Sequence, residues 1–482
     1  MRYTEIASAR PFAGAPKITL PSVYGASPKK PIMIRISVLG ERPMTYGASG
    51  LPKGLSINGG VIFGKVKAEG NYEITLTAEN ALGKDEKKLT LEIKRDTVCL
   101  TPLLGWTSWN AYGFSVKQED IEISAKKLSE LGLAEYGYNY INTDSGWQGP
   151  YGGKFGAITP NEKFPDMKGM VEKIHALGLK AGIYSTPMLV AFGCSMNREV
   201  LPHGCTLGEP DDMFGWERGG IGKIRKEKNN ARQWADFEFD YLKYDWRPCD
   251  PYNAELMRRE LVKTKRDFGF CVTVRARPEY YKYWTKYCNS YRNNPDSIFT
   301  WGRLMTIYNS YFEYVDHINK GHYCDLDMLD SGVCHFFEQQ RYNEREDYGM
   351  SEDEQIVSYT MRAFLNSPIQ ISSDLSLISE FEMDMYCNDE IIAINQDAAF
   401  DTAKPIIKID EGDKIVHVFK KTLEDGNEAY ALFNLGKTTE RVEIPLEAKR
   451  TLRDAWAKRD VGEGEEISLE MPPHTVRVFV VR

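Results

Sequence analysis

Polar side chains that could do chemistry stand at the ends of short apolar segments between residues 98 and 400. These side chains are Trp106, Trp109, Asp144, Ser145, Trp147, Tyr184, Lys243, Asp245, Arg275, Arg277, Arg292, Asp296, Asp325, Asp327 and Asp374. A single polar residue in such a place usually caps the following helix or satisfies a turn. Ionisable or tyrosine side chains at seven of the eight segment ends need another reason, and a bound polar substrate is the simplest.

Asp245 and Asp296 form the best pair for catalysis. Asp245 follows Lys243 on alternate residues of YLKYDW, so both side chains face the same way on a strand. Lys243 would keep Asp245 ionised, which suits a nucleophile, although a purely structural ion pair is the alternative. Asp296 stands four residues after Arg292, on an expected loop that can reach a leaving oxygen. Two carboxylates across a glycosidic bond can hydrolyse it without a cofactor.

The signatures of other chemistries are missing from the sequence. It has no GxxxxGK[ST] or GxGxxG loop at a strand–helix junction, and no G-x-S-x-G elbow. The nine cysteines form no CxxC pair, and no His and Cys residues cluster at zinc spacing. We therefore expect neither a metal nor a cofactor. Cys194 could bridge Cys205 or Cys249 only in an oxidising compartment.

The amino-acid composition limits the classes of molecule that the protein is expected to bind. The 482 residues are 42% hydrophobic and carry a net charge of −8, which indicates a globular chain and disfavours binding to nucleic acid or to an anionic membrane. No apolar stretch is long enough to span a bilayer. No apolar leader is visible, so we expect a cytoplasmic protein, or a periplasmic or secreted one if a leader has been removed. A homo-oligomer stays an open alternative.

Three groups of elements must position these residues. Residues 98–402 alternate short apolar strands with helical stretches, which predicts a (β/α)8 TIM barrel with its active site at the C-terminal ends of the strands. Residues 1–97 and 403–482 alternate apolar and polar positions between turn clusters, which predicts an N-terminal β-sandwich and a C-terminal antiparallel β-sandwich. The expected barrel strands lie in LLGWTSW, YNYINTDSGW, LKAGIYSTP, FDYLKYDW, FCVTVRA, YCNSYRN, CDLDML and PIQISSDL.

Eight ordered motifs resemble glycoside hydrolase family 27, whose members are mainly α-galactosidases and α-N-acetylgalactosaminidases. They cover nearly all of residues 101–397 and read TPLLGWTSWNAYG, YNYINTDSGWQ, KFPDMKGMVEKIHALGLKAGIYS, YLKYD, YCNSYRNNPD, GHYCDLDML, SPIQISSDL and IIAINQD. The string LPKGLSINGGVIFGKVKAEGNYEITLTAENALG is similar to bacterial immunoglobulin-like modules.

The resemblance implies a retaining double displacement on a terminal α-galactoside of an oligosaccharide or glycoside substrate. Asp245 matches the nucleophile and Asp296 the acid/base, and retention requires their carboxyl groups to be about 5–5.5 Å apart. The matching sugar contacts are Trp109, Asp144, Tyr184, Lys243, Arg292 and Asp327. Neighbouring loops add Ser145, Arg275 and Tyr280 to the substrate-binding residues that we expect.

Departures from the family pattern leave the sugar open. Ser145 replaces the second of two adjacent acids, and the VRARPEYY loop fits neither usual pattern for a 2-hydroxyl or a 2-acetamido group. The alternatives are α-N-acetylgalactosaminides or β-L-arabinopyranosides with the same mechanism, or a non-catalytic carbohydrate-binding protein. Arg275 and Arg277 either pair with Glu279 or barrel carboxylates, or recognise an unusual group on the substrate. Residues 189–235 hold a long excursion that we expect at the cleft rim, and Trp246 after the nucleophile is atypical.

Overall fold

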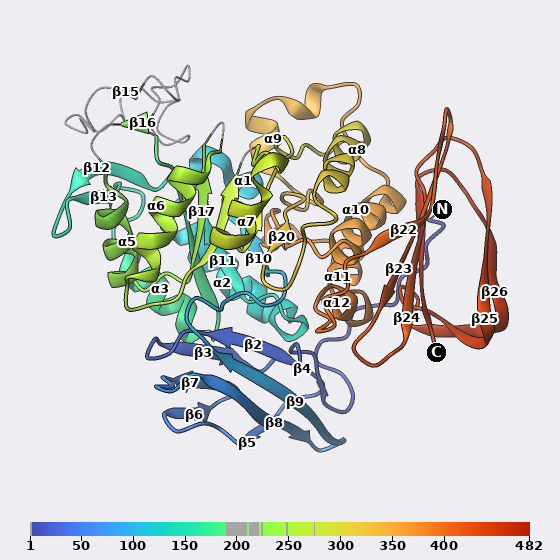
Figure 1. Cartoon of the computed structure of the whole chain (residues 1–482), viewed down its shortest axis with the longest axis horizontal. Helices are drawn as coiled ribbons and strands as arrows, with labels where there is room; N and C mark the ends of the chain where they lie inside the picture. Colours follow the sequence, from blue (N-terminus) through green and yellow to red (C-terminus); the bar gives the residue numbers. More distant parts are fainter. Residues whose placement is uncertain (1, 189–209, 212–220, 223–224, 247–248, 274) are drawn as a thin grey trace.

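The computed structural model describes the chain except residues 1, 189–209, 212–220, 223–224, 247–248 and 274. An N-terminal β-sandwich lies at the bottom of Figure 1, an α/β barrel fills the centre and left, and a C-terminal antiparallel sheet stands at the right. Among the described residues, no helix combines the length and the apolar character that a membrane span needs.

Eight parallel strands form the barrel. Each strand pairs with the next along the chain, in the order β20-β19-β18-β17-β14-β11-β10-β21. The circle closes just past β20, where Leu329 bridges Ile371 of β21 and donates its backbone N–H to the Gln370 carbonyl at 2.9 Å. Each of the eight predicted segments overlaps one of these strands, so the predicted barrel is confirmed. The strands are β10 Leu104–Thr107, β11 Tyr140–Thr143, β14 Lys180–Ser185, β17 Tyr241–Asp245, β18 Gly269–Thr273, β19 Ser290–Tyr291, β20 Tyr323–Cys324 and β21 Ile369–Ile371.

Helices surround the barrel, and side-chain caps fix where several of them begin. Asp166, Asp250 and Thr300 accept a backbone N–H of the first turn in α3, α6 and α8, and Ser351 does the same for α10 within a capping box. The described helices are α1 Ser108–Tyr112, α2 Gln118–Glu130, α3 Met167–Ala176, α5 Glu227–Asp236, α6 Pro251–Val262, α7 Tyr281–Tyr287, α8 Trp301–Ser310, α9 His335–Gln339, α10 Glu352–Phe364, α11 Glu380–Tyr386 and α12 Asp389–Asn395. Two hairpins interrupt the barrel loops: β12 Gln148–Gly152 with β13 Ala157–Pro160, and β15 Pro210–Asp211 with β16 Ile221–Gly222.

The N-terminal sandwich stacks a four-stranded sheet, β2-β9-β8-β5, with a three-stranded sheet, β3-β7-β6, and the short pair β1-β4. Alternate residues such as Ile34, Ile62, Leu76 and Leu91 fill its core. Its strands are β1 Lys17–Ile18, β2 Val23–Ala26, β3 Ile32–Arg35, β4 Val38–Leu39, β5 Thr45–Ser49, β6 Leu55–Asn58, β7 Val61–Gly64, β8 Gly70–Asn80 and β9 Gly83–Ile93. The predicted sandwich is confirmed.

The C-terminal part is one six-stranded sheet that folds over itself, in the order β22-β23-β24-β27-β25-β26. In β27 the side chains of Val476 and Val478 join the barrel core, whereas those of Phe479 and Val481 join a second core inside the folded sheet. The sheet therefore has an apolar layer on both sides, as a sandwich requires. Its strands are β22 Lys404–Glu411, β23 Lys414–Thr422, β24 Glu428–Asn434, β25 Glu440–Asp454, β26 Arg459–Met471 and β27 Thr475–Val481.

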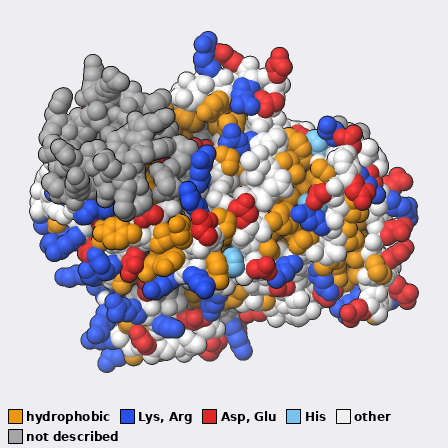
Figure 2. All heavy atoms as spheres, turned by 45° about the horizontal axis from the view of Figure 1, so that its top comes forward, with side chains coloured by type: hydrophobic (Ala, Val, Ile, Leu, Met, Phe, Trp, Pro, Cys, Tyr) orange, Lys and Arg blue, Asp and Glu red, His pale blue; other side chains and the backbone are white. Residues whose placement is uncertain are grey.

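Strand β26 was not among the predicted strands. Its sequence, RDVGEGEEISLEM, contains two glycines and a run of glutamates instead of a clean apolar alternation. It lies at the edge of the sheet, where acidic side chains discourage pairing with another chain. Figure 2 shows acidic side chains gathered along this right-hand edge of the molecule, whereas both charge signs are interspersed over the rest of the visible face.

The segment before the sandwich ties the parts together. The backbone N–H of Thr4 donates to Asp353 at 2.9 Å, just inside α10, and its hydroxyl donates to the Val476 carbonyl in β27 at 2.8 Å. Ala7 then donates to the Trp456 carbonyl at 2.9 Å, and Ala9 donates to Asp384 of α11 at 2.7 Å. Figure 1 accordingly places the N-terminal end beside the C-terminal sheet.

Candidate active site

The predicted polar residues converge at the barrel end that faces away from the N-terminal sandwich. Asp144 follows β11, Tyr184 lies in β14, and Lys243 and Asp245 lie in β17. Arg292 directly follows β19, and Asp327 comes three residues after β20. A small cavity inside this end of the barrel is lined by Tyr241, Lys243, Cys271, Thr273, Arg292, Asp325, Asp327, Met328 and Gln370. The parallel strands thus bring acids and bases from five of the eight strands into one place.

Asp245 ends β17 with its carboxylate next to a phenol. The Tyr184 hydroxyl donates to Oδ2 of Asp245 at 2.8 Å. Burial raises the pKa of Asp245 to about 6, against the opposing charges of Lys243 and Arg292, and the nearby negative charge of Asp296 raises it further. The carboxylate is therefore ionised at neutral pH and more basic than an ordinary aspartate.

Lys243 forms its ion pair with Asp144, so the alternative of a structural Lys243–Asp245 ion pair is wrong. Its ammonium donates to Oδ2 of Asp144 at 2.7 Å. The reason is reach, because β14 lies between β11 and β17 and the long lysine side chain crosses it. The charge of Lys243 still lowers the pKa of Asp245, but burial outweighs it. Asp144 also accepts the backbone N–H of Ser145 at 2.7 Å, so it is held from two sides.

Arg292 joins the second predicted catalytic residue to strand seven. One guanidinium nitrogen donates to Oδ1 of Asp296 at 2.6 Å, and another forms an ion pair with Asp327. The side chains of Arg292 and Asp327 are 3% and 4% exposed, whereas that of Asp296 is 66% exposed. The exposed carboxylate of Asp296 is thus held by Arg292, and Arg292 is itself fixed by its buried ion pair with Asp327. Burial works against the charge of Asp327, but Arg292 and then Lys243 outweigh it and lower its pKa.

Three further predicted residues are Trp109, Tyr280 and Arg275. Trp109 is nearly buried in α1, with its ring 4.7 Å from that of Phe336, and forms an apolar wall together with Met328. Tyr280 lies against the outer helix α7, where its ring meets Trp284 edge-on at 6.1 Å, and no hydrogen bond within the described part of the chain joins it to the carboxylates. Arg275 is exposed in a left-handed conformation with φ 60°.

The remaining sequence expectations have mixed outcomes. Arg277 forms an ion pair with Glu279 at 3.6 Å, one of the two alternatives for this loop. The indole N–H of Trp246 donates to Asp250 at 2.9 Å, so this residue helps to start α6. Most of the excursion at 189–235, with Cys194 and Cys205, lies outside the described residues. Among the described residues, no group of three or more His, Cys, Asp or Glu side chains could hold a metal ion.

Comparison with known proteins relates the chain to alpha-galactosidases. The family model described as "Alpha galactosidase A" matches residues 195–397, and "Alpha galactosidase C-terminal beta sandwich domain" matches residues 413–481. A third model, "Putative Ig domain", matches residues 15–94. The alpha-galactosidase of Oryza sativa subsp. japonica is 25% identical over 398 residues, which cover 79% of this chain and 84% of the relative. That of Lachancea cidri is 27% identical over 379 residues, which cover 70% and 72%.

Solved structures extend the match over the whole chain. A Bacteroides fragilis crystal structure described as a "putative alpha-galactosidase/melibiase" has a TM-score of 0.86 and 28% identity, and covers 98% of this chain and 99% of its own. The chain thus resembles the alpha-galactosidases of glycoside hydrolase family 27, and these relatives support a glycoside hydrolase. A family 27 β-L-arabinopyranosidase from Geobacillus stearothermophilus shares the fold, with a TM-score of 0.67 and 19% identity over 79% of this chain and 96% of that one.

Sequence reasoning missed several residues that support the site of this hydrolase. Asp330, Asn110 and Ser297 form a buried hydrogen-bonded group behind it, and Arg362 of α10 binds the segment that carries Asp327. The density of acids in CDLDMLD was a usable signal for Asp330. Nothing local marks Arg362, because it lies in the middle of a helix and reaches strand seven only in the folded barrel.

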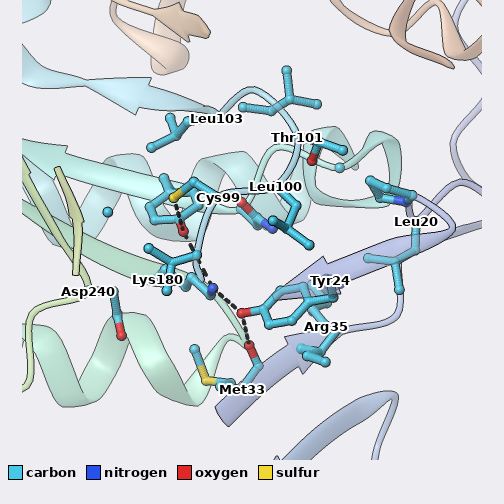
Figure 3. Close-up of a pocket in the computed structure, with 18 of the residues that line it drawn as sticks. Leu20, Tyr24, Met33, Arg35, Cys99, Leu100, Thr101, Leu103, Lys180 and Asp240 are labelled. Carbon is cyan, nitrogen blue, oxygen red and sulfur yellow. Dashed lines mark hydrogen bonds between the residues drawn. The ribbon is translucent and has the colours of Figure 1, made fainter. Parts of the chain in front are cut away.

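Another cavity of the hydrolase lies at the opposite end of the barrel. It has a volume of about 190 Å³ and separates the N-terminal sandwich from the starts of the barrel strands (Figure 3). Lys180, the first residue of β14, donates to the Tyr24 hydroxyl of the sandwich and, at 3.4 Å, to the Tyr140 hydroxyl. None of its lining residues belongs to the carboxylate cluster, so this cavity is a seam between two parts of the chain.

Proposed function

We propose that this family 27 hydrolase cleaves terminal α-galactosides with retention of configuration, with Asp245 as nucleophile and Asp296 as acid/base. The observation that carries the proposal is that the exposed Asp296 carboxylate, held by Arg292, lies close enough to the half-buried Asp245 for its negative charge to raise the pKa of Asp245. The alpha-galactosidase relatives supply the substrate class.

The first step breaks the glycosidic bond. Protonated Asp296 gives its proton to the departing oxygen while the Asp245 carboxylate attacks C1, so that the C1–O bond breaks and an ester between the sugar and Asp245 forms. In the second step Asp296, now a carboxylate, takes a proton from water. The water oxygen attacks C1, the ester breaks, and Asp245 returns to its ionised form. Two inversions give net retention.

The surrounding side chains suit a neutral sugar. The Asp144–Lys243 pair presents a hydrogen-bond acceptor and a donor, which sugar hydroxyls can both use. Trp109 offers an apolar wall for one ring face. The O–H donation from Tyr184 helps to keep Asp245 ionised between turnovers.

A second candidate rests on Ser145, which is buried and occupies the position where the family pattern places another acid. A smaller polar side chain there favours a sugar that makes different contacts next to O4 and C6, such as a β-L-arabinopyranoside. Nitrophenyl glycosides of galactose, N-acetylgalactosamine and arabinopyranose separate the candidates by their kcat/KM ratios.

Two substitutions test the assigned roles. Asp245→Ala should lower kcat by orders of magnitude on the preferred glycoside, because no covalent intermediate can form. Asp296→Ala should spare nitrophenyl substrates more than alkyl glycosides, because a phenolate leaves without much protonation. NMR of the first product should show the same anomer as the substrate. Near-normal turnover by Asp245→Ala, or an inverted product, would overturn the mechanism.

A further inference from the structure

Asp330 connects three loops behind the site. It follows Leu329, the residue that closes the barrel, and its side chain is buried. Its Oδ1 accepts the Asn110 amide at 2.6 Å and the Ser297 hydroxyl at 3.1 Å. Asn110 is next to Trp109, after strand one, and Ser297 is next to Asp296, after strand six. One carboxylate oxygen therefore joins the loops that follow strands one, six and seven.

The loop that carries Asp296 depends on these contacts for its position. Ser297 also donates its backbone N–H to Oδ2 of Asp327 at 2.6 Å, so two carboxylates from strand seven hold the residue after Asp296. Arg303 donates to the Asp296 carbonyl at 2.6 Å, and Asn294 donates to the Asp325 carbonyl at 2.8 Å. Because the carboxylate of Asp296 is mostly exposed and held by Arg292 alone among the contacts described above, its backbone contacts also help to fix where it lies.

The segment that carries Asp330 is itself fixed by a buried arginine. The Arg362 guanidinium donates to the carbonyls of Leu326, Asp327 and Met328 at 3.0, 3.1 and 2.8 Å. Burial, followed by the charge of Asp327, raises the pKa of Asp330 to about 7, with Arg362 opposing. A buried acid of this kind is costly, and apolar residues can replace such groups without loss of stability. Its presence behind Asp296 points to a role other than folding.

We propose that Asp330 is a positioning residue for Asp296, which it acts on through the Ser297 hydroxyl. This inference rests on the proposed acid/base role of Asp296. Asp330 touches neither substrate nor reacting atoms. Its two hydrogen bonds set the distance between the Asp296 loop and the wall that contains Trp109, and so set where the proton is delivered.

The test uses Asp330→Asn and two α-galactosides. Methyl α-galactoside needs a proton on its leaving oxygen, whereas nitrophenyl α-galactoside does not, and kcat/KM covers only the steps through the first bond cleavage. We expect Asp330→Asn to lower kcat/KM for the methyl glycoside by about 10- to 100-fold, because small misplacements of a catalytic group have effects of this size. The value for the nitrophenyl glycoside should stay nearly unchanged. A merely structural role would lower both values by the same factor.

Further variants keep the proposal falsifiable. Ser297→Ala should reproduce the difference between the two substrates, and the double variant should add little to either single one, because the two side chains act as one unit. Asp454→Asn removes another buried carboxylate, which accepts two backbone N–H groups in the C-terminal sheet, and should leave the substrate ratio unchanged. Additive effects, or an equal loss on both substrates, would overturn the proposal.

Asp296→Ala, measured beside these variants, separates a failure of the role of Asp330 from a failure of the acid/base assignment of Asp296. If it shows the leaving-group difference and Asp330→Asn does not, the role of Asp330 is wrong and the proposed function stands. If Asp296→Ala shows no such difference, the acid/base assignment is wrong, and the role of Asp330 falls with it.

Discussion

Asp245 illustrates a conflict between catalysis and stability at the scale of one residue. The proposed nucleophile has to be ionised, yet burial opposes the charge of its carboxylate and is the largest influence on its pKa. Lys243 and Arg292 reduce the penalty, but each is mainly engaged with another acid, Asp144 or Asp327. The site therefore holds a carboxylate that is charged at neutral pH and imperfectly compensated, as a reactive group must be.

The acid side of the pH profile should report this carboxylate. Because the pKa of Asp245 is raised to about 6, kcat/KM should fall as the pH decreases through 6 and the nucleophile takes up a proton. Tyr184→Phe removes a hydrogen bond that lowers this pKa, so the acid limb should move to higher pH. Initial rates on a nitrophenyl galactoside between pH 4 and 8 measure the acid limb of the wild type and that of Tyr184→Phe. Identical limbs in the two proteins would show that Asp245 does not control the titration.

The same shift has a consequence for folding. In the folded protein the pKa of Asp245 is raised from 3.8 to about 6, so the folded state binds the proton more tightly than the unfolded state. The contribution of protonated Asp245 to the free energy of unfolding is fully present below pH 3.8 and is lost as the pH rises to 6. Asp245→Asn should therefore be more stable than the wild type at pH 7, by about 3 kcal/mol, and the gain should disappear below pH 4. Urea unfolding at both pH values tests this, and a variant that is less stable at pH 7 would contradict it.

At the scale of elements, the sequence predicts strands better than contacts. Strands β19 and β20 have only two residues each, yet the predicted segment YCNSYRN contains β19 and CDLDML overlaps β20 at Cys324, because polar residues follow at once. Strand β26 escaped prediction because an edge strand needs few apolar residues. The partner of Lys243 could not be predicted either, since strand pattern gives the facing side but not the reach across β14.

Helix α10 links the site to the C-terminal sheet, and its first turn is testable. The Ser351 hydroxyl accepts the Glu354 backbone N–H at 3.2 Å, and Glu354 accepts the Ser351 N–H at 2.7 Å. Ser351→Ala should lower the free energy of unfolding by about 1 kcal/mol. Ser351→Thr is the matched control, because it keeps the capping oxygen. Urea unfolding of the three proteins decides, and equal stability of the alanine variant and the wild type would contradict a capping role.

For the whole molecule, the N-terminal sandwich acts from the end opposite the site. Glu135 of the barrel is almost fully buried and forms ion pairs with Arg35 at 2.6 Å and Arg42 at 3.1 Å, both from the sandwich. Together with the Lys180–Tyr24 contact, these pairs fasten the sandwich beneath the strand starts (Figure 3). The sandwich contributes no residue to the carboxylate cluster, so its effect should be on stability.

Removing one partner of this buried pair tests that division of roles. Arg35→Met leaves Glu135 with one cation fewer and should lower the free energy of unfolding by about 3 kcal/mol. The kcat of the folded protein at 25 °C should not change. Arg95→Met, at an exposed arginine of the same part of the chain, is the control and should be close to neutral. A change in kcat for Arg35→Met at full folding would show that the sandwich acts on the site.

The contacts of residues 4–9 impose an order on biosynthesis. Thr4 and Ala7 bind the carbonyls of Val476 and Trp456, more than 400 positions later in the chain. On the ribosome these residues emerge minutes or seconds before their partners exist, so they must stay unattached until translation is nearly complete. Docking of this short stretch is thus a late step in folding. A bulky fusion placed directly before it would interfere with this step while leaving the barrel intact.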